Sequence, residues 1–240
     1  MKTILCILLI SMSAVTIQAQ EIHVFEKENV FATSGIKLRA TPSQTGQVIK
    51  IIPFGESFSV LENTEQAQSI EWMDGTWIKG QYQGLEGYIF DGFTSSLPVP
   101  TLDFELTQED LDLSYPLLAW AEYHFDPVRT NDTVQTNHAF VMTQHLENGI
   151  RVQREESDYH FKVEVIMPNT DISDVFILLR SMLLTKLERQ AFNHSAVYIL
   201  NDKGWVDQIK IDLDNPVEIK SLADGSVKIS VVTFHEGCSL

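Results

Sequence analysis

Residues 77–90 read WIKGQYQGLEGYIF, two short runs of apolar and aromatic residues separated by glycines. Within each run the apolar residues alternate with polar ones, which is the period of a β-strand with one buried face. Gly84 and Gly87 supply the backbone freedom that a tight turn requires. We therefore predict a β-hairpin in which residues 77–82 pair with residues 88–90.

The same alternation extends upstream to Ile36, where apolar residues at every second position predict a strand. Residues 48–52 and 58–61 predict two further strands, separated by a corner at Pro53-Phe54-Gly55. Residues 62–75 are mostly polar and acidic, and they predict a long surface loop. Several short strands with frequent turns indicate a small antiparallel barrel over residues 35–97.

The segments GIKLRATPS (residues 35–43), 48–55 and 77–90 together resemble a bacterial SH3 (SH3b) domain. The resemblance covers residues 35–98 only, and we identify no family for the remainder. It implies a small all-β SH3-like barrel with Trp77 in its core. It also implies noncatalytic recognition, often of peptidoglycan peptides and sometimes of protein segments. The chain departs from the family pattern in the insertion at 62–75 and in Lys37-Leu38-Arg39, where many members have Asn-Val-Arg.

Aromatic side chains of this barrel are the candidates for contact with a ligand, because ring faces can grip a short peptide in a shallow groove. The alternative for each is simple packing in the core of a small domain, which we favour for Trp77 and Phe90. Glu71 and Asp74 could pair with an amine or remain solvated surface charges. The ligand-binding candidates are Trp72, Tyr82, Tyr88 and Phe93.

Residues 1–19 have the layout of a secretory signal peptide: a basic start, an apolar run and Ala19 at the expected cleavage point. The alternative is a membrane anchor, but Ser11, Ser13 and Thr16 interrupt a run that would need about 20 apolar residues. We therefore expect an exported protein, periplasmic or extracellular, with no membrane insertion after cleavage. Only Cys238 would then remain of the two cysteines, which excludes an intramolecular disulfide but permits one between chains.

The 240-residue chain carries 17 basic and 33 acidic residues, a formal net charge of −16. Such a surface repels nucleic-acid backbones and anionic lipids, so neither is expected as a partner. Charge and composition leave the oligomeric state open.

We expect residues 20–34 to form an N-terminal segment, 98–102 a proline-containing linker, and 103–240 an α+β domain. A short helix is predicted from Thr107, ending by Pro116, and residues 117–125 fit a strand or a helix. Residues 171–190 show helical periodicity and predict one long helix packed on an antiparallel sheet. The expected strands form a hairpin about Asn148-Gly149, a strand at 161–165, and a meander over 196–234, with no detectable internal repeat.

No pattern in the chain indicates catalysis, a metal site or a cofactor. Six histidines fall in the second domain without the short spacing of a zinc site, and His138 and His145 would lie at opposite ends of one strand. His235 precedes Cys238, the reverse of the order in papain-like cell-wall peptidases, and the cysteine is at a chain end where a fixed pocket is rarely built. We therefore predict that the protein is not an enzyme.

The sequence as a whole predicts an exported bacterial cell-envelope binding protein. We expect its SH3-like module to recognise a peptide or peptidoglycan fragment, or an envelope protein. The second domain is expected to make another interaction. The alternative is a structural scaffold whose partner interface lies on the C-terminal domain. An apolar patch on the sheet face opposite the helix would favour that alternative. A third possibility is an envelope hydrolase or its accessory subunit.

Overall fold

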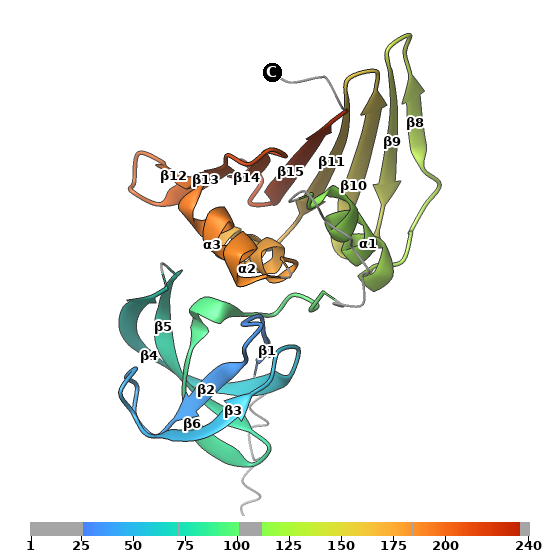
Figure 1. The fold of residues 1–240 in the computed structure, drawn as a ribbon. Helices are drawn as coiled ribbons and strands as arrows, with labels where there is room; N and C mark the ends of the chain where they lie inside the picture. The colour runs from blue at the N-terminus through green and yellow to red at the C-terminus, as the bar shows by residue number, and fades with distance from the viewer. Residues whose placement is uncertain (1–25, 72, 101–111, 184, 236–240) are drawn as a thin grey trace, which may run out of the picture.

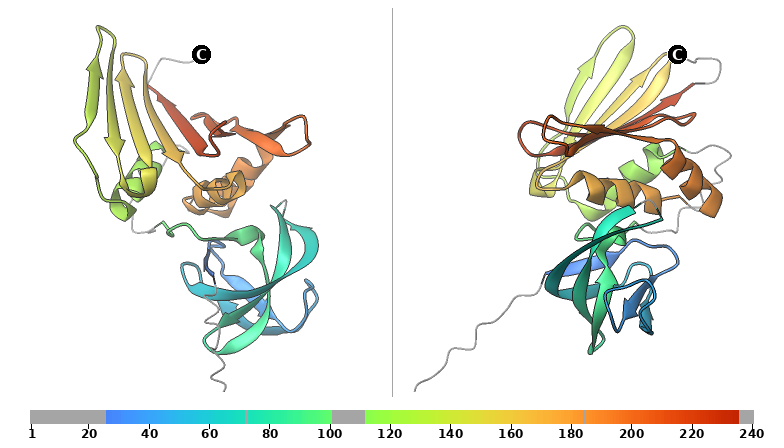
Figure 2. Two further views of the ribbon diagram at one scale, coloured as in Figure 1. Left: turned by 180° about the vertical axis from the view of Figure 1, so that it is seen from behind. Right: turned by 90° about the vertical axis from the view of Figure 1, so that its left-hand side faces the viewer.

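The structure of this chain, a computed structural model, describes residues 26–71, 73–100, 112–183 and 185–235. It contains two antiparallel β-sheets, of seven and eight strands, with helices lying between them (Figure 1). Both views in Figure 2 show this layering, with the first sheet on one side of the helices and the second sheet on the other. The architecture is predominantly β, as the period-two patterns predict.

The first sheet curls into a half-barrel (Figure 1). Its strand order is β3-β2-β6-β5-β4-β1-β7, and all neighbouring pairs are antiparallel. The strands are β1 (Lys27–Val30), β2 (Ile36–Arg39), β3 (Val48–Ile52), β4 (Ser57–Ile70), β5 (Met73–Tyr82), β6 (Leu85–Phe90) and β7 (Thr94–Ser95), with a 3₁₀ turn at Asp91–Phe93.

The hairpin predicted for residues 77–90 is confirmed by the pairing of β5 with β6. Its turn consists of Gln83 and Gly84, whose φ angles of 50° and 78° lie in the left-handed region. The prediction that Gly87 belongs to this turn is wrong, because Gly87 lies within β6. A Cβ at this position would come within 2.7 Å of the Arg39 carbonyl oxygen, so glycine allows β2 to approach closely.

The surface loop predicted for residues 62–75 is also wrong. Most of these residues extend β4 and β5 into a long hairpin, in which Ile70 lies opposite Met73. The register of β4 shifts twice, between Val60 and Glu62 and again between Asn63 and Gln66. Such bulges interrupt strict alternation, which explains why period-two reasoning missed this part of the strand.

The sheet also begins earlier than predicted, because β1 lies within the N-terminal segment expected to precede the barrel. Asn29 on this strand is paired with Ser57 of β4 and with Ser95 of β7. The side-chain nitrogen Nδ2 of Asn29 also donates to the Leu97 carbonyl oxygen at 2.9 Å. The chain before Gly35 therefore adds a strand to the first sheet, between β4 and β7.

The second sheet has the strand order β12-β13-β14-β15-β11-β10-β9-β8. Its strands are β8 (Asp132–Gln135), β9 (Ala139–His145), β10 (Arg151–Ser157), β11 (His160–Met167), β12 (Ala196–Leu200), β13 (Val206–Ile211), β14 (Val217–Ser221) and β15 (Val227–Phe234). The helices are α1 (Ser114–His124), α2 (Ile172–Ser181) and α3 (Lys186–His194). The hairpin about Asn148-Gly149, the strand at 161–165 and the meander over 196–234 are confirmed.

The second sheet repeats one topological unit, a helical segment followed by a four-stranded meander. The first unit is α1 with β8 to β11, and the second is α2 and α3 with β12 to β15. The last strands of the two units, β11 and β15, pair antiparallel at the centre of the sheet. The two units share the order of their elements but not a similar sequence, so no internal repeat is detectable in the sequence.

The single long helix predicted for residues 171–190 is wrong, because α2 ends at Ser181 and α3 begins at Lys186. A capping box starts the second helix. The Thr185 hydroxyl accepts the Glu188 N–H at 3.1 Å, and the Glu188 carboxylate accepts the Thr185 N–H at 2.6 Å. Both bonds satisfy backbone donors that a continuous helix would have paired internally.

The helix predicted from Thr107 begins outside the described residues. Residues 117–125, which fitted a strand or a helix, belong largely to α1. Pro116 lies in the first turn of this helix and not at the end of one, a position where the missing N–H of proline has no helical partner to lose.

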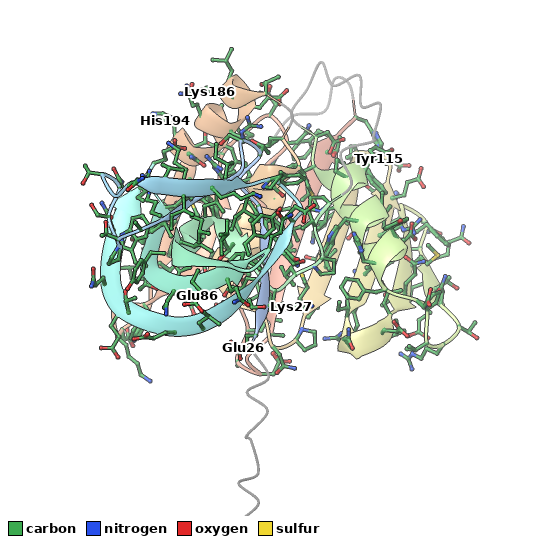
Figure 3. The ribbon with its side chains drawn as sticks, turned by 90° about the horizontal axis from the view of Figure 1, so that it is seen from below. Glu26, Lys27, Glu86, Tyr115, Lys186 and His194 are labelled. Atoms are coloured by element: carbon green, nitrogen blue, oxygen red, sulfur yellow. The ribbon has the colours of Figure 1, made fainter. Side chains whose placement is uncertain are left out.

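The described part of the predicted linker, residues 98–100, contacts α1. The Trp120 indole nitrogen donates to the Pro98 carbonyl oxygen at 2.8 Å, and a ring nitrogen of His124 lies 3.0 Å from the Val99 carbonyl oxygen. Buried residues from both sheets and the helices form one continuous hydrophobic cluster. Viewed from below, the half-barrel covers the α2–α3 half of the second sheet, while α1, marked by Tyr115, lies to its side (Figure 3).

Candidate binding pocket between the sheets

The structure places the predicted ligand-binding aromatics in different surroundings. Tyr82 and Phe93 are buried in the hydrophobic cluster, Tyr88 is half-buried, and Trp72 lies outside the described residues. Tyr82 and Tyr88 lie near the turn of the β5–β6 hairpin, whereas Phe93 follows the opposite end of β6. Tyr82, Tyr88 and Phe93 therefore do not form one exposed groove.

Trp77 and Phe90 are buried, as expected for core residues. Their rings meet edge to face with centroids 5.9 Å apart. Phe93 packs against Phe90 in the same way, also at 5.9 Å. This aromatic cluster supports the end of the half-barrel that faces α2.

Arg180 of α2 holds the helix against this end of the half-barrel. Its guanidinium carbon lies 5.4 Å from the centroid of the Phe93 ring, a cation–π contact. The same guanidinium pairs with Glu71 at 3.7 Å and donates from Nε to the Asn193 side-chain oxygen at 3.2 Å. Burial lowers the pKa of Arg180, although arginine keeps its charge throughout the physiological range. Glu71, which the sequence suggested as a partner for an amine, thus lies beside Arg180 with its side chain largely exposed.

A cavity of about 290 Å³ lies at this junction between the half-barrel and the first turns of α2. The half-barrel contributes residues from β1, from the start of β5, from the 3₁₀ turn and from β7, while α2 contributes one wall. The lining residues are Glu28, Met73, Asp74, Gly75, Thr76, Asp91, Gly92, Thr94, Ser173, Asp174 and Ile177. Met73 and Gly92 are the sequence neighbours of Trp72 and Phe93, two of the predicted ligand-binding residues.

Four carboxylates line the pocket, and none of the described residues on its lining is basic. Asp91 is held by Thr76, whose backbone N–H donates to Oδ1 at 2.5 Å and whose hydroxyl donates to Oδ2. Glu28 accepts a hydrogen bond from the Thr94 hydroxyl. Asp174 is hydrogen-bonded to Ser95. Three acids are thus fixed by hydroxyl groups, while Asp74 is exposed at the rim.

Burial raises the pKa of Glu28 from its ordinary value of 4.5, and the negative charges of Asp91 and Asp174 add to the effect. Burial also raises the pKa of Asp174 from its ordinary value of 3.8. The hydroxyl groups of Thr94 and Ser95 oppose these shifts by donating to the carboxylates. Ionising both acids therefore costs free energy, and a bound cation would offset that cost.

Sequence reasoning identified Asp74 as a possible partner for an amine but missed Glu28, Asp91 and Asp174. These three acids come from β1, the 3₁₀ turn and α2, so no spacing in the chain connects them. Gly75 is the one lining residue whose type hints at the site from the sequence. A Cβ there would lie 2.5 Å from Asp91 Oδ1, so glycine allows the carboxylate to approach the start of β5.

The histidines of the second sheet pair separately with acids. His145 lies 2.8 Å from Asp132, and His138 lies 3.5 Å from Asp158. Within the described ranges, no group of three or more His, Cys, Asp and Glu side chains is arranged to hold a metal ion. Cys238 falls outside those ranges.

One line of groups superficially resembles a catalytic triad. The Ser157 hydroxyl lies 3.1 Å from His160 Nδ1, and His160 Nε2 lies 3.3 Å from Glu155. However, the same hydroxyl oxygen accepts the backbone N–H groups of Tyr159 and His160, at 3.2 and 3.0 Å. The serine thus stabilises the β10–β11 turn, a common role for serine at such positions.

The face of the second sheet opposite the helices is polar at its centre. Val163 and Val165 of β11 are buried on the helix side, so the alternating Lys162 and Glu164 face outward. Glu164 pairs with Lys162 at 2.8 Å and with Lys228 of β15 at 3.2 Å. These pairs lower the pKa of Glu164, although burial opposes them. The centre of this face therefore lacks the apolar patch that would favour a scaffold interface there.

Comparison of the chain with protein-family models, with curated proteins and with solved structures finds no match. Among the helices of the described residues, none combines the length and apolar character needed to cross a bilayer. The pocket geometry is therefore the main basis for a functional proposal.

Proposed function

We propose that this chain is an exported bacterial envelope protein that binds a peptide without catalysing a reaction on it. In this proposal the first sheet is the SH3-like module, and the acidic pocket takes a positively charged amino group of the peptide. A peptidoglycan stem peptide with a free amine is the ligand class we favour. The observation that carries the proposal is the presence of four carboxylates on the lining of one cavity, with no basic side chain among the lining residues that the structure describes.

The size of the pocket supports recognition of one side chain or chain end. A volume of about 290 Å³ lies at the lower end of the range for small-molecule sites, which is about 300–1,000 Å³. An alkylammonium group fits the chemistry, because its three N–H donors can reach several carboxylate oxygens at once. Met73 and Ile177 on the lining can pack against the aliphatic part of such a side chain.

Binding to purified peptidoglycan tests the proposal. Asp74→Asn removes one rim charge with almost no change of shape. A hydrogen bond to a charged group contributes about 1.5–3 kcal/mol, so the dissociation constant should rise roughly tenfold to a hundredfold. Glu86→Gln is the matched control, because it removes one acid from the far end of the same sheet, where Glu86 pairs with Lys79 on the surface.

Acetylation of the free amines of the peptidoglycan provides a second arm. Acetylation should weaken retention of the wild-type protein. We expect the loss to be at least as large as the loss that Asp74→Asn causes on untreated peptidoglycan. Equal retention of wild type and Asp74→Asn, or retention unaffected by acetylation, would show that the pocket does not bind an amine. Absence of any retention would exclude peptidoglycan as the ligand.

A scaffold role for the second sheet is the second candidate function. Its strongest support is an apolar edge strand, β12, whose large side chains are exposed. This role does not depend on the acidic pocket.

A further inference from the structure

The strand β12 at the edge of the second sheet exposes a continuous apolar segment. All four residues from Val197 to Leu200 are exposed, with relative accessibilities of 58% for Val197 and 57% for Leu200. Trp205, in the turn that follows, is 70% exposed. Within the described part of the chain, β12 pairs with β13 alone and forms the outer edge of the sheet (Figure 1).

The other edge of the same sheet is protected against edge-to-edge contact. There, β8 begins with Asp132, which pairs with Arg129 at 3.0 Å and with His145 at 2.8 Å. Charged side chains on an edge strand disfavour pairing with another strand. In contrast, residues 195–201 read SAVYILN and contain no charge.

The hydrogen bonds to β13 show which backbone groups of β12 are directed outward. The Ser195 carbonyl accepts the Asp212 N–H at 3.3 Å, and the Asn201 N–H donates to the Trp205 carbonyl at 2.8 Å. Backbone groups alternate between the two sides of a strand. The N–H and C=O groups of Ala196, Tyr198 and Leu200 therefore face the open edge.

We propose that β12 pairs antiparallel with β12 of a second copy of this chain, about a two-fold axis at Tyr198. Because Tyr198 directs its backbone groups outward, the two copies of Tyr198 can exchange both of their backbone hydrogen bonds. The two second sheets would then form one continuous sheet across the dimer. An interface of this kind uses the same patch on both chains, as two-fold symmetry requires.

The side chains of β12 suit this register. Antiparallel pairing about Tyr198 sets Val197 of one copy opposite Ile199 of the other, two β-branched residues that pack well across strands. The small Ala196 meets the large Leu200.

The self-complementary register favours a second copy as the occupant, because the same strand supplies both members of each facing pair. Each chain has a formal net charge of −16, so most approaches of two copies are repulsive. The uncharged segment 195–201 offers a site where the copies can meet without placing acids against acids. The proposal rests on this edge alone and is independent of the acidic pocket.

Disulfide trapping tests both the contact and its register. In a Cys238→Ser background, a cysteine is introduced by Tyr198→Cys in one variant and by Val197→Cys in another. Facing residues in a hydrogen-bonded antiparallel pair have Cα atoms about 5.5 Å apart, within the disulfide range of about 4.4–6.8 Å. The two copies of residue 197 do not face each other, because each is one residue from the two-fold axis in opposite directions. Their Cα atoms would lie about 8 Å apart, which is too far for a disulfide.

We expect the Tyr198→Cys variant to form a disulfide-linked dimer under mild oxidation and the Val197→Cys variant to remain largely without a cross-link. Comparable cross-linking of both variants, or preferential cross-linking through position 197, would overturn the proposed register.

Sedimentation of the mature chain under reducing conditions tests the dimer without any disulfide. The wild type should reach twice the mass of one chain as concentration rises. Val197→Lys should abolish the dimer, whereas Val134→Lys, at a valine of similar exposure (60%) on the protected edge β8, should leave it intact. Circular dichroism establishes that both variants are folded. A wild type that stays monomeric up to millimolar concentration, or a Val197→Lys variant that still dimerises, would overturn the proposal.

Discussion

Replacing Trp120 by phenylalanine should loosen the attachment of α1 to the segment that leaves the first sheet. Trp120 is 1% exposed, and its ring packs edge to face against Phe125 with centroids 5.5 Å apart. Its indole N–H donates to the Pro98 carbonyl oxygen at 2.8 Å. Phenylalanine keeps the aromatic packing in part but cannot donate this bond, so Pro98 loses its buried partner.

Two contributions set the size of the effect. A partly buried acceptor left without its donor costs about 1–2 kcal/mol, and the space left by the smaller ring adds about 1 kcal/mol. The free energy of unfolding should therefore fall by about 2–3 kcal/mol, a large fraction of the roughly 5–15 kcal/mol that stabilises a typical domain. With a denaturant slope of about 2–3 kcal/mol per M, the urea midpoint should decrease by roughly 1 M.

Urea unfolding followed by far-ultraviolet circular dichroism measures this change, with Trp205→Phe as the matched control. Trp205 is 70% exposed, so its replacement should alter the free energy of unfolding by less than about 0.5 kcal/mol. Both variants should be compared with the wild type at one low protein concentration, so that association does not contribute. A Trp120→Phe variant within 0.5 kcal/mol of the wild type, or equal losses in the two variants, would refute the reasoning.

Three further outcomes follow from local geometry and charge. Gly87→Ala should lower the free energy of unfolding by at least about 2 kcal/mol in urea titrations, because its Cβ would lie 2.7 Å from the Arg39 carbonyl oxygen; an unchanged midpoint would contradict that close approach. Thr185→Ala should cost about 1 kcal/mol by removing the N-cap of α3, whereas Thr185→Ser should restore most of the stability in the same titration. Burial raises the pKa values of Glu28 and Asp174, so their stabilising contribution is complete below their ordinary values of 4.5 and 3.8 and is lost as pH rises through the raised values. The melting temperature should therefore decline less between pH 4 and pH 7.5 for Glu28→Gln than for the wild type. An identical decline would mean that burial does not raise the pKa of Glu28.

Local patterns in the chain were sufficient where the deciding interactions are local. The β5–β6 hairpin and the hairpin about Asn148-Gly149 follow from alternating side chains and from turn residues that adopt positive φ. Where β4 bulges, alternation breaks down, and the same reasoning predicted a loop. The boundary between α2 and α3 had a local signal, Thr185 three residues before Glu188, but the apolar periodicity across it indicated one helix.

The sequence by itself determined that this protein is built mainly from antiparallel strands, because the period of two and the turn residues act over only a few positions. Only the tertiary structure decided how those strands combine, including the central β11–β15 pair and the open edge of β12. The acidic pocket depends on the same long-range packing, since Glu28, Asp91 and Asp174 meet only when α2 lies against the half-barrel. No local pattern specifies such a meeting, because its free energy comes from burying surfaces that are distant in the chain.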